Sequence, residues 1–235
     1  MELVGERHLD WDGSCNARDL GGLGKVKRGA VVRMEAPNGL TAAGWAAAWD
    51  YGVRTVVDLR NSDEYGTDGA ERPAGITTVR APLDPVGTPF YEHWHKIDYL
   101  ASPLYYAPLL AEHPEVVIGA VRAVANAAPG GVVFHCAAGK DRTGLLALVL
   151  LTLAAATPDE IITDYHLTFT RRRHLYTAPD SYDELAYLTE VLTRHNTTAE
   201  TLLTATITAL PMPTYLLDNG LTEAELAALH TRLTG

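Results

Sequence analysis

The sequence contains few cysteines and lacks a long hydrophobic run. Cys15 and Cys136 are its only two cysteines, which is too few for a disulfide framework, and they do not have the spacing of a metal site. The longest apolar run, residues 145–156, is too short to cross a bilayer. Residues 1–10 lack the apolar core of a signal peptide. We therefore expect a cytoplasmic protein with reduced cysteines and no bound metal or cofactor, although export without a signal peptide would leave no trace in the sequence.

Positive charge is also scarce. The chain has 19 Lys and Arg residues against 29 Asp and Glu residues, a formal net charge of −10. Such a charge argues against nucleic acid as a partner and against attachment to anionic membranes by overall charge. It leaves room for a small anionic substrate, because a local basic pocket can overcome a distant negative field. The sequence leaves the oligomeric state open.

Strand and helix signals alternate in the N-terminal half. Apolar, β-branched segments predict strands at residues 29–34, 53–59, 75–83 and 131–135. Residues 41–52 predict a helix with Thr41 as its N-cap, and helices dominate after residue 114. This pattern predicts a single α/β domain over residues 1–235, in which a short, mostly parallel sheet is flanked by helices and followed by a helical C-terminal part.

Residues 85–113 are rich in Pro, Tyr, His and Trp and are too long for a plain loop. They predict an irregular or helical insertion. It would form either a lid over a site or a surface subdomain packed by its own aromatic side chains. In a lid, some of these side chains would stack on a substrate ring: His93, Trp94, His95, Tyr99, Tyr105 and Tyr106.

One segment places charged residues between two apolar ones. The sequence HCAAGKDRTG, residues 135–144, follows the apolar GVVF and precedes the apolar LLALVLLTLAAA. A strand, a tight loop and a helix in this order bind an anion, because the loop N–H groups and the helix N-terminus both point at it. The phosphate-binding residues predicted here are Ala137, Ala138, Gly139, Lys140, Asp141 and Arg142.

Cys136 and Arg142 carry the chemistry predicted for this loop. The helix dipole and the guanidinium both stabilise a thiolate, so we expect Cys136 to ionise readily and to act as a nucleophile. The planar Arg142 side chain fits two phosphate oxygens. Gly139 permits a positive φ or a close backbone approach, and Thr143 is placed to hydrogen-bond the sulfur. A structural cysteine in a β–α turn would leave the charges in the loop unexplained.

This loop resembles the phosphate-binding loop of the protein-tyrosine-phosphatase superfamily. Its GKDRTG ending resembles that of the bacterial tyrosine-phosphatase-like family that includes the PtpB-type enzymes. The likeness extends over nearly the whole chain through NARDLGGL (16–23), VVDLRNSDE (56–64) and YLLDNGLTEAELAAL (215–229). It implies hydrolysis of phosphotyrosine and, in some members, of phosphoserine, phosphothreonine or phosphoinositides. The chain departs from the family at Ala17, usually aromatic, and at residues 33–41, so we expect different pocket walls.

The mechanism that follows needs no metal and passes through a phosphocysteine. Cys136 attacks phosphorus, a general acid protonates the leaving oxygen, and water hydrolyses the intermediate while Arg142 and the loop N–H groups hold the phosphate oxygens. Two residues are candidates for the acid. Asp84 follows a predicted strand, where the superfamily carries an aspartate on a mobile loop. Asp141 resembles the family's aspartate in the phosphate loop; its alternative role is to pair with Arg142 or Lys140 and shape the loop.

Further residues are expected to assist the reaction without taking part in bond breaking. Lys140 is a second cation that would favour multiply charged substrates such as phosphoinositides, or it neutralises Asp141. An Arg-Asp pair in the 16–23 segment would buttress the loop, and Asp58 with Arg60 would form an ion pair at the edge of the site. The complete supporting set is His135, Thr143, Asn16, Arg18, Asp19, Asp58 and Arg60.

The function predicted from these residues is a cysteine-dependent phosphomonoesterase, acting as a tyrosine-protein phosphatase or as a dual-specificity or phosphoinositide phosphatase. The alternative is a phosphatase of a nucleotide, a sugar phosphate or another small metabolite in a biosynthetic pathway. A rhodanese-like sulfurtransferase also uses a loop cysteine, but the six-residue spacing from Cys136 to Arg142 argues against it. An inactive phospho-ligand binder would not need both a nucleophile and an arginine.

Overall fold

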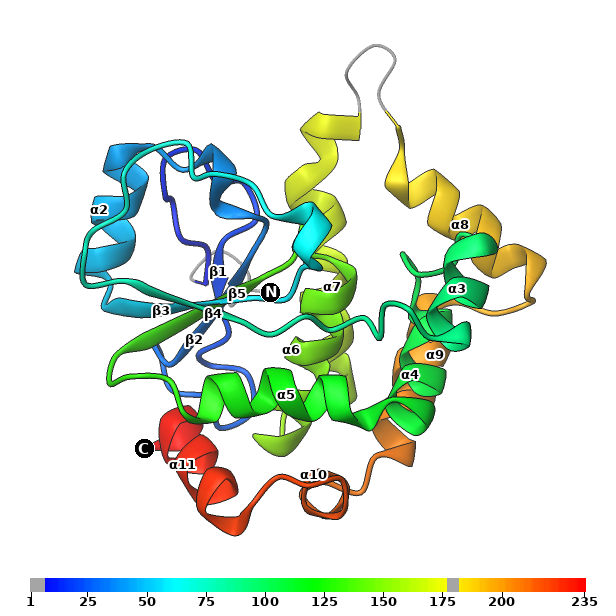
Figure 1. The fold of residues 1–235 in the computed structure, drawn as a ribbon. Helices are drawn as coiled ribbons and strands as arrows, with labels where there is room; N and C mark the ends of the chain where they lie inside the picture. The colour runs from blue at the N-terminus through cyan, green and yellow to red at the C-terminus, as the bar shows by residue number, and fades with distance from the viewer. Residues whose placement is uncertain (1–6, 177–181) are drawn as a thin grey trace.

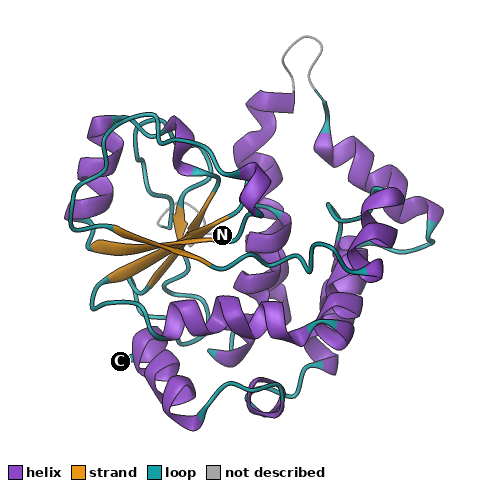
Figure 2. Ribbon diagram, in the orientation of Figure 1, coloured by secondary structure: helices purple, strands orange, loops and turns teal. Residues whose placement is uncertain are grey.

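A five-stranded sheet lies toward one side of the molecule, with a large group of helices on the other side (Figures 1 and 2). The computed structural model describes residues 7–176 and 182–235, so residues 1–6 of the N-terminal segment considered above lie outside it. The strands follow the order β1–β2–β5–β3–β4, with only β1 antiparallel to its neighbour. Their bounds are β1 Arg18–Asp19, β2 Val31–Met34, β3 Val53–Asp58, β4 Thr77–Arg80 and β5 Gly131–His135. The predicted mostly parallel sheet is confirmed.

Valine-rich sequences form the three central strands. β2, β3 and β5 are buried along nearly their whole length, as expected of parallel strands covered on both faces. The register pairs Met34 and Asp58 with His135, so the carboxyl ends of these strands meet at one edge of the sheet. The sequence signals did not predict β1, because its two residues are both charged and carry no strand pattern.

Helices cover both faces of the sheet. α2 packs against one face, with Trp45 and Ala48 among the valines of β2 and β3. α5 and α6 pack against the other face (Figure 1). No helix in the described ranges combines the length and apolar character needed to span a bilayer. The helix bounds are α2 Ala42–Asp50, α3 Pro89–Lys96, α4 Tyr106–Glu112, α5 Pro114–Ala125, α6 Asp141–Leu153, α7 Pro158–Tyr176, α8 Glu184–Arg194, α9 Ala199–Ala209, α10 Thr214–Asp218 and α11 Glu223–Thr234.

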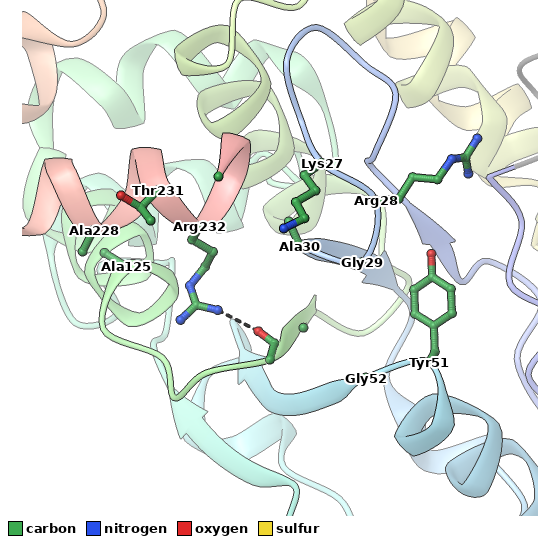
Figure 3. A pocket seen from close by; sticks show the side chains of 13 residues that line it. Lys27, Arg28, Gly29, Ala30, Tyr51, Gly52, Ala125, Ala228, Thr231 and Arg232 are labelled. Carbon is green, nitrogen blue, oxygen red and sulfur yellow. Dashed lines mark hydrogen bonds between the residues drawn. The ribbon is translucent and has the colours of Figure 1, made fainter.

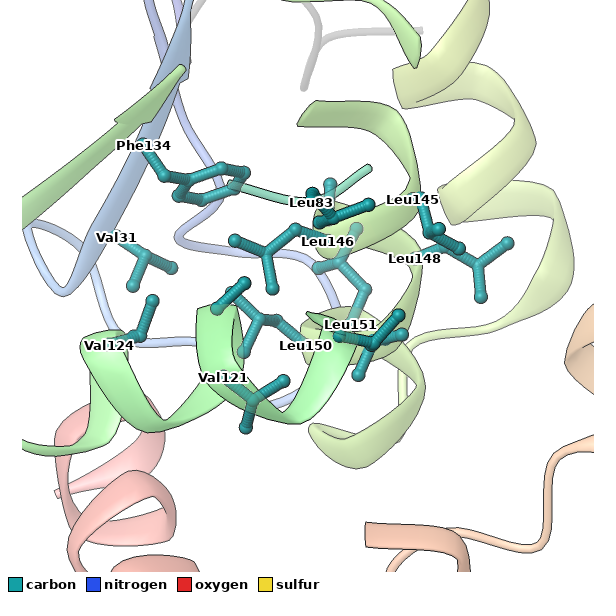
Figure 4. Close-up of a cluster of buried hydrophobic side chains, with 14 of the residues drawn as sticks. Val31, Leu83, Val121, Val124, Phe134, Leu145, Leu146, Leu148, Leu150 and Leu151 are labelled. Carbon is teal, nitrogen blue, oxygen red and sulfur yellow. The ribbon is translucent and has the colours of Figure 1, made fainter. Parts of the chain in front are cut away.

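The core fixes the segment that joins β5 to α6. Figure 4 shows Phe134 of β5 in the same apolar cluster as Leu146 and Leu150 of α6 and Val121 of α5. Every residue of α6 from position 143 to 151 is buried. Truncating one such leucine to alanine costs about 2–5 kcal/mol. The loop between β5 and α6 is therefore held by the core at both of its ends.

The insertion at residues 85–113 is largely helical. It contains α3, the 3₁₀ turn η3 (Pro103–Tyr105) and α4. Tyr106 is buried with α4 in the core, and Trp94 meets Tyr105 edge-on at 5.4 Å between ring centroids. Part of this segment is thus packed by its own aromatic rings. Part of the cavity described next is lined by Tyr91, His95, Leu100 and Ala101 of this segment.

Candidate active site

The loop of residues 136–140 begins directly after β5 and ends at the N-terminus of α6. Gly139 adopts a φ of +68°, and a Cβ added there would lie 2.3 Å from the Met34 carbonyl oxygen. Both reasons for a glycine at this position therefore apply, since side chains disfavour this φ and the neighbouring strand leaves no space. The close contact ties the loop to the end of β2.

All carbonyl groups of this loop are hydrogen-bonded within the protein. The bonds are Cys136 O with His135 Nδ1 at 2.9 Å, Ala137 O with Ala36 N at 2.9 Å, Ala138 O with Asn16 Nδ2 at 3.3 Å, Gly139 O with Arg33 Nη2 at 2.9 Å, Lys140 O with Gly144 N at 2.7 Å and Asp141 O with Tyr106 Oη at 2.8 Å. The carbonyl dipoles of the loop are therefore directed into the protein.

The N–H groups of the same loop are left available. Among the residues that the structure describes, none accepts a hydrogen bond from the backbone N–H of residues 137–142. The first N–H groups of α6 add the partial positive charge of a helix N-terminus. Consecutive free N–H groups in such a loop form an anion-binding site.

Cys136 begins this loop, and Arg142 is the second residue of α6, just beyond its other end. Cys136 is buried at its start, with 2 % of its surface exposed. Arg142 stays protonated at neutral pH. Burial opposes its charge, but Glu64, Cys136 and Asp84 together raise the pKa of Arg142 above its ordinary value. Cys136 is thus close enough to Arg142 to contribute to this rise in its pKa.

Glu64, at the end of the 3₁₀ turn η2 (Ser62–Glu64), fixes the orientation of Arg142. Its two carboxylate oxygens accept hydrogen bonds from Arg142 Nη1 and Nη2, the latter at 2.6 Å. Although burial alone would raise the pKa of Glu64, Arg142 lowers it, so Glu64 is ionised. Glu64 thus occupies the end of the guanidinium that Nη1 and Nη2 form. The edge that Nε and Nη2 form has no partner among the described residues, so it can bind an anion.

Asp84 lies beside Arg142, after the end of β4. Its Oδ2 is 3.2 Å from Arg142 Nη1 and accepts a hydrogen bond from Asn61 Nδ2, also at 3.2 Å. Burial raises the pKa of Asp84 above its ordinary value, while Arg142 and Asn61 oppose that rise. A carboxyl group with a raised pKa can retain a proton for donation to a group bound beside it.

Asp141 is the first residue of α6. Its Oδ1 accepts a hydrogen bond from Lys140 Nζ at 2.9 Å. Lys140 Nζ also donates to the Ala101 carbonyl in the insertion at 3.2 Å, and the residue is only 3 % exposed. Lys140 therefore links the phosphate loop to the insertion and does not extend into solvent.

A cavity of about 300 Å³ opens between the loop and the insertion. Besides Asp84, Asp141 and Arg142, its lining comes from the η2 turn and from the insertion. Tyr91 and His95 of α3 form part of the wall, with their rings stacked at 5.7 Å. Neither Ala17 nor residues 33–41, where the sequence departs from the family, lines this cavity. The expectation that these departures change the pocket walls is therefore wrong for this cavity.

The supporting residues are distributed around the site. Asn16 contacts the loop directly, and Arg18 Nη1 donates to Asn16 Oδ1 at 2.5 Å. Asp19 lies away from the loop, where it accepts bonds from Gly21 N and Gly29 N, each at 2.8 Å.

The remaining supporting residues lie near the ends of β3 and β5 and in the first turn of α6. Asp58 and Arg60 form an ion pair at 2.9 Å, and His135 Nε2 lies 3.8 Å from Asp58 Oδ1. Burial lowers the pKa of His135, so it is neutral at neutral pH. The Thr143 hydroxyl is buried without a hydrogen-bond partner in the described residues, so the bond predicted to the Cys136 sulfur is not formed in this structure.

Four residues around the loop were not predicted from the sequence: Asn61, Glu64, Arg33 and Asp164. Glu64 ends the VVDLRNSDE segment, which was its only sequence signal. Arg33 and Asp164 form a buried ion pair, with 2.7 Å between Arg33 Nη1 and Asp164 Oδ2. The two residues are 131 positions apart in the chain, so no local pattern reveals their contact. The only indication of a buried ion pair in the sequence was that Arg33 lies in an apolar strand and Asp164 in a partly apolar helix.

A larger cavity of about 730 Å³ lies at the other end of the sheet (Figure 3). It is lined by residues before β2, β3 and β5 and by α11, and it contains none of the predicted site residues. Arg232 reaches into it and donates to the Gly130 carbonyl at 2.8 Å, which ties α11 to the loop before β5. The smaller cavity is the one lined by predicted site residues, namely Asp84, Asp141 and Arg142, whereas Cys136 is buried at the start of the loop and is not among its lining residues.

Known proteins resemble this chain over most of its length. A Cupriavidus necator protein named, provisionally, as a tyrosine-protein phosphatase is 30% identical over 184 residues, or 69% of this chain and 63% of the relative. A Nostoc commune tyrosine-protein phosphatase is 30% identical over 161 residues, or 67% of this chain and 53% of the relative. The matched region is thus less than two thirds of either relative.

One solved structure also aligns with this fold. It is P. aeruginosa TpbA in complex with phosphotyrosine, with a TM-score of 0.35 and 17% identity over 81% of this chain and 94% of that chain. Family membership rests on the sequence. Residues 9–235 match the tyrosine phosphatase family, which is nearly the entire chain. The protein therefore belongs to the tyrosine phosphatase family.

Proposed function

We propose that this protein is a cysteine-dependent phosphomonoesterase that hydrolyses phosphotyrosine. The observation that carries the proposal is the segment of residues 136–142, which comprises the loop and the first two residues of α6. Its carbonyls are bonded inward, its N–H groups are free within the described structure, and Cys136 and Arg142 lie at its ends. Six N–H groups and a guanidinium supply the charge stabilisation that a transferring phosphoryl group needs, so the reaction proceeds without a metal.

The first half of the reaction transfers the phosphoryl group to Cys136. The thiolate attacks phosphorus opposite the tyrosine oxygen, forming an S–P bond while the P–O bond breaks. The electron pair of that bond passes to the tyrosine oxygen, which takes a proton from Asp84. Arg142 and the loop N–H groups hold the three other phosphate oxygens.

The second half releases phosphate. Water attacks the phosphorus of phosphocysteine and gives a proton to the Asp84 carboxylate. The S–P bond breaks, its electron pair returns to sulfur as the thiolate, and inorganic phosphate leaves. The site is then in its starting state.

We assign the general acid to Asp84 rather than to Asp141. Asp84 is buried beside Arg142, and its raised pKa favours the protonated form that an acid requires. Asp141 accepts a hydrogen bond from Lys140, which places it in the role of fixing that lysine. Both carboxyl groups line the same cavity, so mutation is the test that separates them.

The walls of the cavity support an aromatic substrate. Tyr91 and His95 offer ring surfaces next to the phosphate site, and both curated relatives carry tyrosine-protein phosphatase names. Lys140 is turned toward Asp141 and Ala101, so it does not present a free cation to a second phosphate. This arrangement favours phosphotyrosine over a phosphoinositide, a nucleotide or a sugar phosphate.

The proposal is tested by hydrolysis of p-nitrophenyl phosphate and of phosphotyrosine peptides in the presence of a metal chelator. Cys136→Ser should abolish turnover and Cys15→Ser should preserve it. Burial, together with Glu35, raises the pKa of Cys15 to about 11, so this second cysteine is a thiol at neutral pH and serves as the matched control. A wild-type protein without activity, or a fully active Cys136→Ser variant, contradicts the proposal.

A further inference from the structure

Beneath the phosphate loop, one buried carboxylate pairs with three arginines. Asp164 of α7 lies 2.9 Å from Arg7 Nη1, 3.0 Å from Arg18 Nε and 2.7 Å from Arg33 Nη1. All four side chains are buried. Burial by itself would raise the pKa of Asp164, but Arg18, Arg33 and Arg7 lower it well below its ordinary value. Asp164 is therefore an ionised group at neutral pH that holds these arginines together.

Two of the arginines connect Asp164 to the phosphate loop. Arg33 donates from Nη1 to Asp164 and from Nη2 to the Gly139 carbonyl at 2.9 Å. Arg18 donates from Nη1 to Asn16 Oδ1 at 2.5 Å, and Asn16 Nδ2 donates in turn to Ala138 O at 3.3 Å and to Gly139 O at 3.4 Å. Both connections end on the carbonyl side of the loop.

The direction of these carbonyls sets the direction of the N–H groups that follow them. A trans peptide unit is planar, with its C=O and N–H pointing in opposite directions. A carbonyl of residue 138 that is drawn into the protein therefore turns the N–H of residue 139 outward, and the same holds for residues 139 and 140. These are N–H groups that donate to no residue in the described part of the chain.

The same cluster supplies charge. Three guanidinium groups surround a single carboxylate, so positive charge exceeds negative charge below the loop. Asp164 offsets one of these charges, so its contribution to phosphate binding lies in holding the arginines in place and not in the charge that it carries. Removing the Asp164 charge would leave three buried guanidiniums without their shared partner, and they would then separate.

We propose that Asp164 is a positioning residue for phosphate binding. It fixes Arg33 and Arg18 so that these arginines, directly and through Asn16, hold the loop with its N–H groups turned toward the phosphate. The inference rests on the proposed function, because such positioning matters only if the loop binds phosphate. It assigns a role in the reaction to a residue of α7, outside both the loop and the cavity.

Three variants test this role at different strengths. Asp164→Asn keeps the shape of the side chain and removes its charge. Arg33→Met removes the hydrogen bonds of Arg33 to Asp164 and to the loop. Arg33→Lys keeps the charge but cannot reach the Asp164 carboxylate and the Gly139 carbonyl together. We measure the binding of vanadate by calorimetry, and kcat and KM with p-nitrophenyl phosphate and phenyl phosphate. Vanadate should bind about 10- to 100-fold more weakly to Asp164→Asn and Arg33→Met, since a displacement of about 1 Å can cost 10²-fold. Arg33→Lys should show a smaller loss.

The kinetic pattern separates positioning from acid catalysis and from loss of stability. Both substrates should slow by a similar factor in these variants, whereas loss of the general acid affects mainly the poorer leaving group. Leu229→Ala, in the buried face of α11, lowers stability without touching the loop and should keep wild-type affinity for vanadate. All variants are compared at a temperature where circular dichroism shows them folded.

Each result decides the matter. If folded Asp164→Asn and Arg33→Met bind vanadate and turn over as the wild type does, the positioning role is wrong while the proposed function stands. An equal loss in Leu229→Ala also overturns it, because general destabilisation then accounts for the effect. If the wild type neither binds vanadate nor hydrolyses either substrate, the proposed function fails and the inference fails with it. Should Asp164→Asn not fold, Arg33→Lys decides.

Discussion

Replacing Asp84 with asparagine should slow hydrolysis of phosphotyrosine by about 10²–10⁴-fold, the usual contribution of a general acid. This corresponds to about 2.7–5.4 kcal/mol of transition-state free energy. Asparagine preserves the shape of the side chain and the neighbours Arg142 and Asn61, but it has no proton to donate. The Asp84 side chain is 7% exposed, so water has little access to replace it as the acid.

The effect should depend on the leaving group. Tyrosine leaves with an ordinary pKa of about 10 and needs a proton, whereas p-nitrophenolate is a stable anion that leaves without one. Asp84→Asn should therefore lose most of its activity with phenyl phosphate and phosphotyrosine peptides and much less with p-nitrophenyl phosphate. The assay is kcat for a series of aryl phosphates of increasing phenol pKa.

The pH profile gives a second readout. Burial raises the pKa of Asp84, so the protonated acid persists to higher pH and wild-type kcat should decline only as pH rises through that raised value. Without a titrating acid, Asp84→Asn should lose this basic limb. Asp141→Asn is the matched control, because it removes a carboxylate from the same cavity. A flat basic limb and leaving-group dependence in Asp141→Asn, with a normal profile in Asp84→Asn, would refute the assignment.

Three further predictions concern the frame of the site. Glu64→Gln, which weakens the hold on Arg142, should reduce vanadate affinity by about tenfold or more, because a bond to a charged group contributes about 1.5–3 kcal/mol; inhibition assays measure it. Gly139→Ala should abolish phosphate binding and lower the melting temperature, since its Cβ would lie 2.3 Å from a backbone oxygen. Asp164→Asn should lower the free energy of unfolding by about 3–5 kcal/mol at pH 7, measured by urea denaturation.

The pH dependence of the last effect follows from the lowered pKa of Asp164. Because the pKa in the folded state is below the value of about 3.9 in the unfolded chain, its contribution is fully present above that value. It is lost as pH falls through the folded-state pKa. Wild type and Asp164→Asn should therefore converge in stability at low pH. A constant difference between the two proteins down to the acid transition would show that the charge of Asp164 is not responsible.

The sequence predicted the elements whose signals are local. Apolar strands, the Thr41 cap and the strand–loop–helix around HCAAGKDRTG depend on residues that are close in the chain, and β5 has the predicted bounds. The mostly parallel sheet followed from the order of these signals. Placing Cys136 at the start of the loop and Arg142 just beyond its other end required only their spacing and the helix that begins at Asp141.

The contacts that orient the loop could not be predicted in this way. Glu64 meets Arg142 across 78 residues, and Asp164 meets Arg33 across 131 residues. Such pairs form only once the sheet and α7 have packed, and a charged residue in a helix reads as a solvent-exposed one until its partner is known. The two-residue strand β1 was missed for the related reason that pairing with β2, not its own sequence, makes it a strand.

The most direct test of the account is to trap the covalent intermediate. Rapid acid quenching during turnover of a phosphotyrosine peptide, followed by peptide mass spectrometry, should find one phosphoryl group on Cys136 in the wild type and in Cys15→Ser. Asp84→Asn should retain this intermediate for longer, because the carboxylate that accepts the proton of water is absent. Phosphate on another residue, or turnover with no phosphocysteine in any of these proteins, would contradict the mechanism.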